Sequence, residues 1–195
     1  LSLRRQRQMC IRDSADAVWT QGERFGTIGL KIGERIYEIT THRAEAYSPD
    51  SRKPEVVYAD EINVDLSRRD FTINAMALEL TSDTPTLVDP FGGAADLMTR
   101  QLRTPLSAEE SFSDDPLRML RAARFISQLE VAPDPSITAA VTAMADRLTI
   151  VSAERVRIEF DKLMVTKRPT FGLWFLVDTG LVDHFLPELR LMRLE

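Results

Sequence analysis

The stretch Leu66-Ser67-Arg68-Arg69-Asp70-Phe71-Thr72-Ile73-Asn74-Ala75-Met76-Ala77 places two arginines and an aspartate directly before an apolar, helix-like pattern. A guanidinium can bind a phosphate through two parallel hydrogen bonds, so Arg69 suits an anionic ligand. Asp70 could accept a hydrogen bond from a sugar hydroxyl. Alternatively, it pairs locally with Arg69 and caps a helix that we expect from residue 70 or 71 to residue 78. Asn74, one turn further on, could reach the same ligand or cap locally.

A second charged stretch covers residues 114–125 and reads Asp114-Asp115-Pro116-Leu117-Arg118-Met119-Leu120-Arg121-Ala122-Ala123-Arg124-Phe125. On an ideal helix Arg118, Arg121 and Arg124 form a slanting ridge. Nearly every other direction is apolar, which predicts a buried helix. Buried arginines need partners, because an unpaired buried charge is costly. Those partners could be acids of the chain itself, or a polyanion or base held in a cleft.

Asp115 and Arg118 together could read the pairing edge of a base. A carboxylate accepts from an exocyclic amino group, and a guanidinium donates to a ring nitrogen or a carbonyl. Cytosine and adenine present an amino donor beside a ring-nitrogen acceptor, whereas uracil and guanine present the reverse arrangement. The pair is therefore expected to accept C and A, and to reject U and G because the wrong base leaves buried groups unpaired.

The composition is that of a globular protein with a core: 44% of the 195 residues are hydrophobic and 28% are charged. A formal net charge of -5 argues against coating nucleic acid through bulk charge, although a local basic cleft is compatible with it. The single cysteine, Cys10, cannot form an internal disulfide, so a reducing, cytoplasmic compartment is expected. The sequence contains no apolar run near the roughly 18 residues that a membrane span needs.

The first part of the chain predicts strands and the second part predicts helices, with the composition changing near residue 105. Two antiparallel strands are expected near 25–32 and 35–42, joined at Gly33-Glu34, with Glu38 on the same face as Ile36 and Thr40. The other expected elements are a loop over 44–59 with a short strand at 56–58, a helix near 61–66, a tight turn rather than a phosphate loop at 89–97, and helices near 114–129, 135–148, 152–166 and 170–187, the last broken at Gly180.

The helix over 152–166 is expected to begin at Ser152 as its N-cap. Two pairs of opposite charge four residues apart, Arg155/Glu159 and Arg157/Asp161, should support it.

Several of these motifs resemble those of one enzyme family. Residues 68–76, the Asp114-Asp115-x-x-Arg118 helix and Ser152-Ala153-Glu154-Arg155 look like consecutive motifs of the class II tRNA nucleotidyltransferase and bacterial poly(A) polymerase family. Asp89-Pro90-Phe91-Gly92-Gly93 resembles its connecting motif, and residues 37–43 resemble its central catalytic strand. The likeness covers roughly residues 16 to 190, and is nearest to the actinobacterial type of CCA-adding enzyme.

The resemblance implies an α+β fold. A partial polymerase-β-like nucleotidyltransferase head (15–105), a small antiparallel sheet with helices, would precede an all-helical neck and start of a body (106–195). Such enzymes use CTP and ATP to add C, C and A to the tRNA 3′ end without a nucleic-acid template. By similarity Arg69 and Asp70, with Arg68 and Asn74 as secondary residues, would contact the sugar and phosphates of the nucleotide. Asp115 and Arg118 would read the base, Arg121 and Arg124 would hold phosphates, and Glu38 would be a third catalytic carboxylate.

The sequence also departs from the family pattern. A Gly-Gly-x-Val-Arg-Asp motif followed by Asp-x-Asp, whose aspartates hold Mg²⁺ in the family, is absent and is expected just before Ala15. Residues 1–14 resemble translated adapter sequence. We therefore expect a fragment truncated at both ends, without catalytic activity, whose relatives continue into a tRNA-binding body and sometimes an HD phosphohydrolase domain. A bacterial poly(A) polymerase and a non-catalytic, helical RNA-binding module remain the alternative readings.

Overall fold

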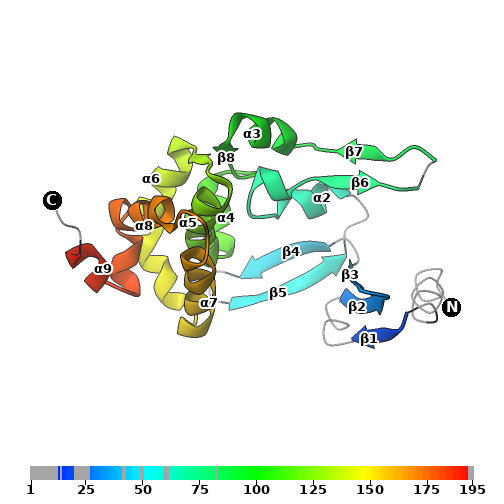
Figure 1. Ribbon diagram of the computed structural model, residues 1–195, viewed down its shortest axis with the longest axis horizontal. Helices are drawn as coiled ribbons and strands as arrows, with labels where there is room; N and C mark the ends of the chain where they lie inside the picture. The colour runs from blue at the N-terminus through cyan, green and yellow to red at the C-terminus, as the bar shows by residue number, and fades with distance from the viewer. Residues whose placement is uncertain are drawn as a thin grey trace.

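The computed structural model describes residues 13, 15–19, 27–40, 43–48, 51–58, 62–81 and 83–192, with only the backbone for 43–48 and 51–58. Strands dominate the first part of the chain and helices pack together in the second, which confirms the predicted α+β class (Figure 1). The first three strands lie at the opposite end of the molecule from the last helix, α9 (Figure 1). The division near residue 105 stays a prediction.

Five strands open the described chain. β1 (Ala17–Trp19), β2 (Thr27–Ile32) and β3 (Arg35–Thr40) form an antiparallel sheet in that order, which confirms the predicted strand pair. Gly33 turns the chain between β2 and β3 with a φ of +59°, a conformation that suits glycine.

The loop predicted over 44–59 is wrong, because β4 (Arg43–Ser48) and β5 (Ser51–Tyr58) form an antiparallel hairpin there. The short strand predicted at 56–58 is confirmed as the end of β5. Pro54 lies within β5. Within the described residues β5 pairs with β4 alone, and a strand with one unpaired edge tolerates a proline.

The predicted helix near 61–66 is confirmed as α2 (Ile62–Ser67), but the helix predicted to reach residue 78 is wrong. A single 3-10 turn, η2 (Thr72–Asn74), is followed by β6 (Ala77–Glu79), which pairs with β7 (Thr86–Val88). The backbone N–H of Thr72 donates to the Arg103 carbonyl oxygen at 2.9 Å, and its hydroxyl donates to Asp96 at 2.6 Å. These tertiary bonds replace the local ones that an α-helix would make.

The glycines at 92 and 93 serve a turn and a close contact, as predicted, before α3 (Gly93–Thr99). Gly92 has a φ of +74°. A Cβ at Gly93 would lie 2.1 Å from the Thr72 carbonyl oxygen, so only glycine lets α3 pack against η2. The Asp89 carboxylate accepts from the N–H groups of Gly93 at 2.7 Å and Ala94 at 2.9 Å, and so takes the helix start that a phosphate would otherwise bind.

The second part of the chain contains helices and two short parallel strands, β8 (Gln101–Leu102) and β9 (Ala132–Pro133). The helices are α4 (Ala108–Asp114), α5 (Leu117–Leu129), α6 (Pro135–Met144), α7 (Ala153–Met164), α8 (Pro169–Asp178) and α9 (Glu188–Leu191), with 3-10 turns η3 (Ala145–Ile150) and η4 (Leu181–His184). Sequence analysis missed α4. Its signal is the capping box formed by Ser107 and Glu110.

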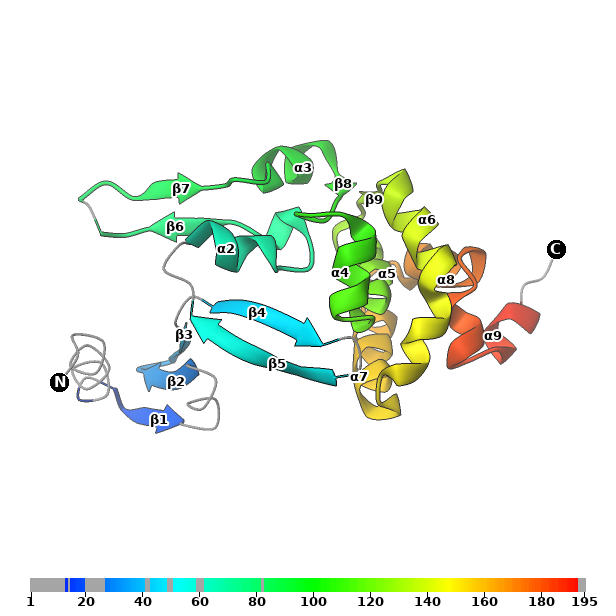
Figure 2. The same cartoon turned by 180° about the vertical axis from the view of Figure 1, so that it is seen from behind.

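The hydrophobic core is centred on α5, which packs against α7 and α8 (Figure 2). Met119, Leu120, Ala122 and Ala123 are fully buried, so the prediction of a helix buried on nearly all sides is confirmed. Pro116 starts α5 at residue 117, rather than at the predicted 114. None of the helices in the described part of the chain has the length and apolar character that a bilayer span requires.

Candidate functional site

The two charged stretches found in the sequence meet in the structure. One carboxylate oxygen of Asp70, in the turn that follows α2, accepts from Arg121 Nε of α5 at 2.9 Å and also pairs with Nη2 of the same guanidinium. The Arg118 Nη2 group donates to the backbone carbonyl oxygen of Arg68 at 2.6 Å. The predicted proximity of residues 68–70 and the arginine helix is therefore confirmed.

Asp70 is a buried acceptor within this junction. Its second carboxylate oxygen accepts from the Phe71 backbone N–H at 3.0 Å and from Asn74 Nδ2 at 3.2 Å. Asn74 thus reaches the same cluster, one of the two possibilities left open by the sequence. The local Arg69–Asp70 pair is wrong, because Arg69 bonds to Asp65 instead, and the expected α-helix cap at Asp70 is replaced by the η2 turn.

Asp65 is a member of the site that sequence analysis missed. Its Oδ1 accepts from Arg68 Nη2 at 2.6 Å, and its Oδ2 accepts from Arg69 Nη2 at 2.8 Å. Burial of this carboxylate opposes its ionisation, but the hydrogen bonds from the two arginines outweigh that effect and lower the pKa of Asp65 to about 2. The available signal was its spacing of three and four residues from the arginines.

Arg118 and Arg124 are buried and have partners within the chain. Arg118 Nη1 donates to the Ser111 hydroxyl at 3.0 Å and to the Ser111 carbonyl oxygen at 3.3 Å. Arg124 Nε donates to Glu159 at 2.8 Å and its Nη1 donates to Gln128 at 2.7 Å. The Arg124 guanidinium also lies 4.1 Å from the centre of the Phe125 ring. Arg124 therefore pairs with an acid of the chain, the first possibility raised by the sequence, whereas the oxygens that accept from Arg118 are neutral.

Glu159 of α7 holds the far end of the arginine ridge. It is buried, and it also accepts from Lys162 Nζ at 2.8 Å and lies 4.0 Å from Arg121 Nη1. Burial of Glu159 tends to raise its pKa, but the bonds from Lys162 and Arg124 bring the pKa below its usual value. The predicted Arg155/Glu159 pair is wrong.

Arg155 pairs instead with Asp115, between α7 and the junction of α4 and α5. The distance from Arg155 Nη2 to Asp115 Oδ2 is 3.1 Å, and Asp115 Oδ1 accepts from the Leu117 N–H at 3.2 Å. A base that used Asp115 would compete with Arg155 for its carboxylate. Ser152 precedes α7 as predicted, although its side chain makes no capping hydrogen bond, and the predicted Arg157–Asp161 pair is present at 3.6 Å.

Glu38 is not brought to this cluster. It is exposed on β3, and Figures 1 and 2 show that sheet well away from α5. Among the described residues there is no group of three or more histidine, cysteine or acidic side chains able to hold a metal ion. The carboxylates of Asp65, Asp70 and Glu159 accept from arginine or lysine donors, so they do not fit Mg²⁺. The catalytic role of Glu38 stays a prediction.

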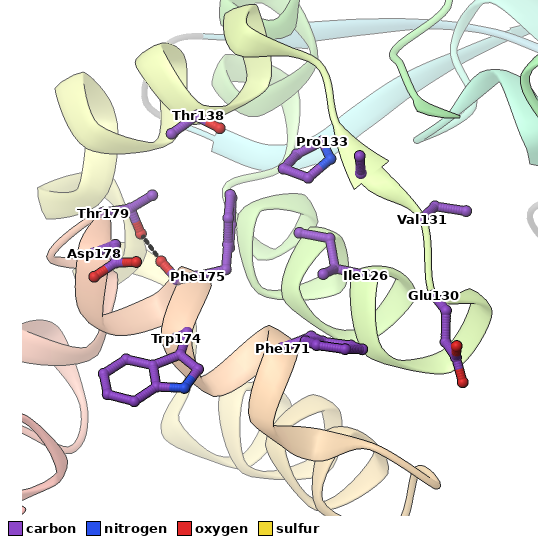
Figure 3. A pocket seen from close by; sticks show the side chains of 11 residues that line it. Ile126, Glu130, Val131, Pro133, Thr138, Phe171, Trp174, Phe175, Asp178 and Thr179 are labelled. Carbon is purple, nitrogen blue, oxygen red and sulfur yellow. Dashed lines mark hydrogen bonds between the residues drawn. The ribbon is translucent and has the colours of Figure 1, made fainter. Parts of the chain in front are cut away.

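An apolar cavity of about 500 Å³ lies on another face of α5, between α5, α8 and the start of α6 (Figure 3). Ile126, Phe171 and Phe175 line it, together with the acidic side chains of Glu130 and Asp178. Two acids and an apolar wall suit a nucleoside triphosphate poorly, since like charges repel. The candidate site is therefore the junction of α2 and α5 rather than this cavity.

The fold and this junction define a two-part α+β protein in which a buried arginine helix is docked on a short charged segment of the strand-rich part. Residues 3–103 match the family model of the poly A polymerase head domain, and residues 131–192 match that of the probable RNA- and SrmB-binding site of polymerase A. The chain belongs to the poly A polymerase head domain family.

The chain is similar to several CCA-adding enzymes. Those of Levilactobacillus brevis and Bacillus subtilis are each 40% identical over 84% of this chain and 41% of their own length. The Bacillus stearothermophilus CCA-adding enzyme in complex with CTP superposes with a TM-score of 0.79 at 31% identity, over 92% of this chain and 43% of that one.

A tRNA nucleotidyltransferase complexed with a primer tRNA and an incoming ATP analog superposes with a TM-score of 0.71 at 30% identity, over 93% of this chain and 50% of that one. This chain spans about two fifths of the length of the curated relatives it matches. The actinobacterial subtype stays a prediction.

Proposed function

We propose that this chain is the nucleotide-binding part of a CCA-adding tRNA nucleotidyltransferase, which selects CTP and ATP for addition to the tRNA 3′ end. The observation that carries the proposal is the junction of the two charged stretches, made by Asp70 with Arg121 and by Arg118 with the Arg68 carbonyl. Solved relatives of similar fold are complexes with CTP, and with primer tRNA and an ATP analog, which supports both ligand classes.

The proposed phosphate-side roles of Arg69 and Arg121 follow from how far their side chains reach the surface. Arg69 is bound to Asp65 at one end yet leaves 47% of its side chain exposed, so it can donate to phosphate oxygens. Arg121 is 31% exposed and can do the same beside Asp70, which would accept from the sugar. Arg124, which the family resemblance assigns to the phosphates, is buried against Glu159 and would support the phosphate side by fixing α5. Asp115 and Arg118 would read the base.

We further propose that this chain alone binds nucleotides without adding them. In this family an Asp-x-Asp pair would hold Mg²⁺, which would supply electrostatic stabilisation for the transfer of the nucleotide. No two aspartates of the sequence are separated by a single residue, and the described acids of the site do not fit a metal. Incubation with a tRNA that lacks CCA and labelled CTP and ATP should give no incorporation, and any addition would contradict this.

Calorimetric titration of the chain with CTP, ATP, UTP and GTP tests the proposed selectivity. CTP and ATP should bind about tenfold more tightly than the other two, because only their bases present an amino donor to Asp115 beside a ring-nitrogen acceptor for Arg118. Arg118→Ala should reduce this preference more than it reduces overall affinity. Arg157→Ala, which removes an exposed arginine of α7, is the matched control and should bind as the parent does. Equal affinity for all four nucleotides would overturn the proposal.

The same titration separates the two alternative functions. The family model that matches residues 3–103 is named for poly(A) polymerase, which would bind ATP without CTP. The model that matches residues 131–192 is named for RNA binding, and a non-catalytic module of that kind would bind a tRNA 3′ end but no free nucleotide. Binding of both CTP and ATP is the result that favours CCA addition.

A further inference from the structure

Asp65 is a buried residue that binds two arginines of the proposed nucleotide site. It is 3% exposed and accepts from Arg68 at one carboxylate oxygen and from Arg69 at the other. A single buried carboxylate therefore fixes two consecutive arginine side chains. Because the hydrogen bonds are charge-assisted, they hold the guanidinium groups more firmly than neutral acceptors would.

The two arginines that Asp65 binds differ in how far they are exposed. The side chain of Arg68 is only 16% exposed, and its backbone carbonyl accepts from Arg118 at 2.6 Å. Arg69, by contrast, keeps about half of its side chain at the surface. Through Arg68, Asp65 thus restrains the carbonyl that orients Arg118. Through Arg69, it restrains a guanidinium that faces solvent.

We propose that Asp65 is a positioning residue that holds Arg69 ready for the anionic groups of the nucleotide and keeps the Arg68 carbonyl in place for Arg118. It acts through these arginines and does not touch the nucleotide. The inference rests on the proposed function. Its physical basis is preorganisation: an arginine already fixed by a buried carboxylate loses less conformational freedom when a phosphate binds.

A purely structural role for Asp65 is the competing explanation, and Asp96 provides the matched control. Asp96 is 4% exposed and accepts from Arg103 Nε at 2.8 Å and from the Thr72 hydroxyl at 2.6 Å, neither of which is assigned a contact with the nucleotide. Asp65→Asn and Asp96→Asn each remove one buried charge and keep the side-chain shape. Both variants should lose thermal stability, whereas only Asp65→Asn should weaken nucleotide binding.

The experiment compares CTP and CMP binding by the chain and its two variants. We expect Asp65→Asn to weaken CTP binding by about tenfold, the typical effect of losing one oriented charged contact, and to reduce the preference for CTP over CMP. Asp65→Glu, which keeps the charge, should recover part of this affinity. Unchanged CTP binding in Asp65→Asn, or an equal loss in Asp96→Asn, would overturn the positioning role. Absence of CTP binding by the parent chain would instead refute the proposed function.

Nuclear magnetic resonance relaxation of the arginine Nε groups tests the positioning directly, without any nucleotide. The Arg69 side chain should be ordered in the parent chain and in Asp96→Asn, and distinctly more mobile in Asp65→Asn. An equally ordered Arg69 in Asp65→Asn would overturn the inference whether or not the parent binds CTP.

Discussion

The three arginines of α5 have the same spacing but different surroundings. Arg121 pairs with Asp70 and remains partly exposed, Arg118 donates to neutral oxygens of Ser111 and Arg68, and Arg124 is held by Glu159. Of the three, only Arg121 has both a carboxylate partner and a partly exposed side chain. It is therefore suited to donate to a phosphate in place of the Asp70 carboxylate. The buried Arg124–Glu159 pair is better suited to fixing the helix.

Glu159→Gln should therefore destabilise the protein by about 3 kcal/mol at neutral pH, because it leaves the buried Arg124 without its carboxylate. Asp161→Asn, on the same helix, breaks the exposed Arg157 pair and should cost no more than about 0.5 kcal/mol. Urea unfolding measures both changes. Similar losses in the two variants would contradict the importance of burial.

The pH dependence of Glu159→Gln has a defined sign. The pKa of Glu159 is lowered in the folded protein from its ordinary value of 4.5, so its contribution to stability is present above that pH and is lost as the pH falls through the folded pKa. The gap in unfolding free energy between the parent chain and the variant should accordingly narrow below about pH 4.5.

At the scale of elements, the packing of α8 on α5 depends on one glycine. A Cβ at Gly172 would lie 2.3 Å from the Ala123 carbonyl oxygen and 2.6 Å from a Leu163 methyl carbon. The Gly172 N–H also donates to the Ser127 hydroxyl at 2.8 Å. Such close backbone approach brings the apolar residues of both helices into contact, and it places α7 with Glu159 beside the arginine ridge.

Gly172→Ala is expected to destabilise the protein by about 2 kcal/mol through overpacking, although alanine is the better helix former. Ala139→Gly, the reverse exchange at an exposed position of α6, should cost about 1 kcal/mol from helix propensity alone. Thermal unfolding followed by circular dichroism compares them. A gain in stability for Gly172→Ala would show that α8 can move away without loss.

For the whole molecule, the two ends are stabilised unequally. The main core cluster contains residues from Phe71 to Val182, whereas β2 contributes its own small buried pair, Ile28 and Leu30. On β3, every residue is exposed, including Ile36 at 69%. An exposed apolar strand that pairs on one side within the described residues is a surface on which other chains can add.

Hydrogen exchange should show this difference as a gradient along the chain. Amides of β2 and β3 should exchange through local opening, well before those of α5 and α8, which open only with global unfolding. Mass spectrometry of peptides covering 27–40, 117–129 and 169–178 measures it. Strong protection of residues 27–40 comparable with α5 would contradict an unequally stabilised molecule.

The α+β class, the buried arginine helix and the turns at Gly33 and Gly92-Gly93 could be predicted from the sequence, because they follow from local periodicity and from backbone conformations that favour glycine. The pairing of each arginine with its acid could not, since Asp70 and Arg121 are 51 residues apart and Glu159 and Arg124 are 35 apart, and the packing of the chain brings them together. That packing also ended the helix predicted after Asp70, because Thr72 bonds to Arg103 and Asp96. Local patterns fix which groups need partners, whereas chain packing selects the partners.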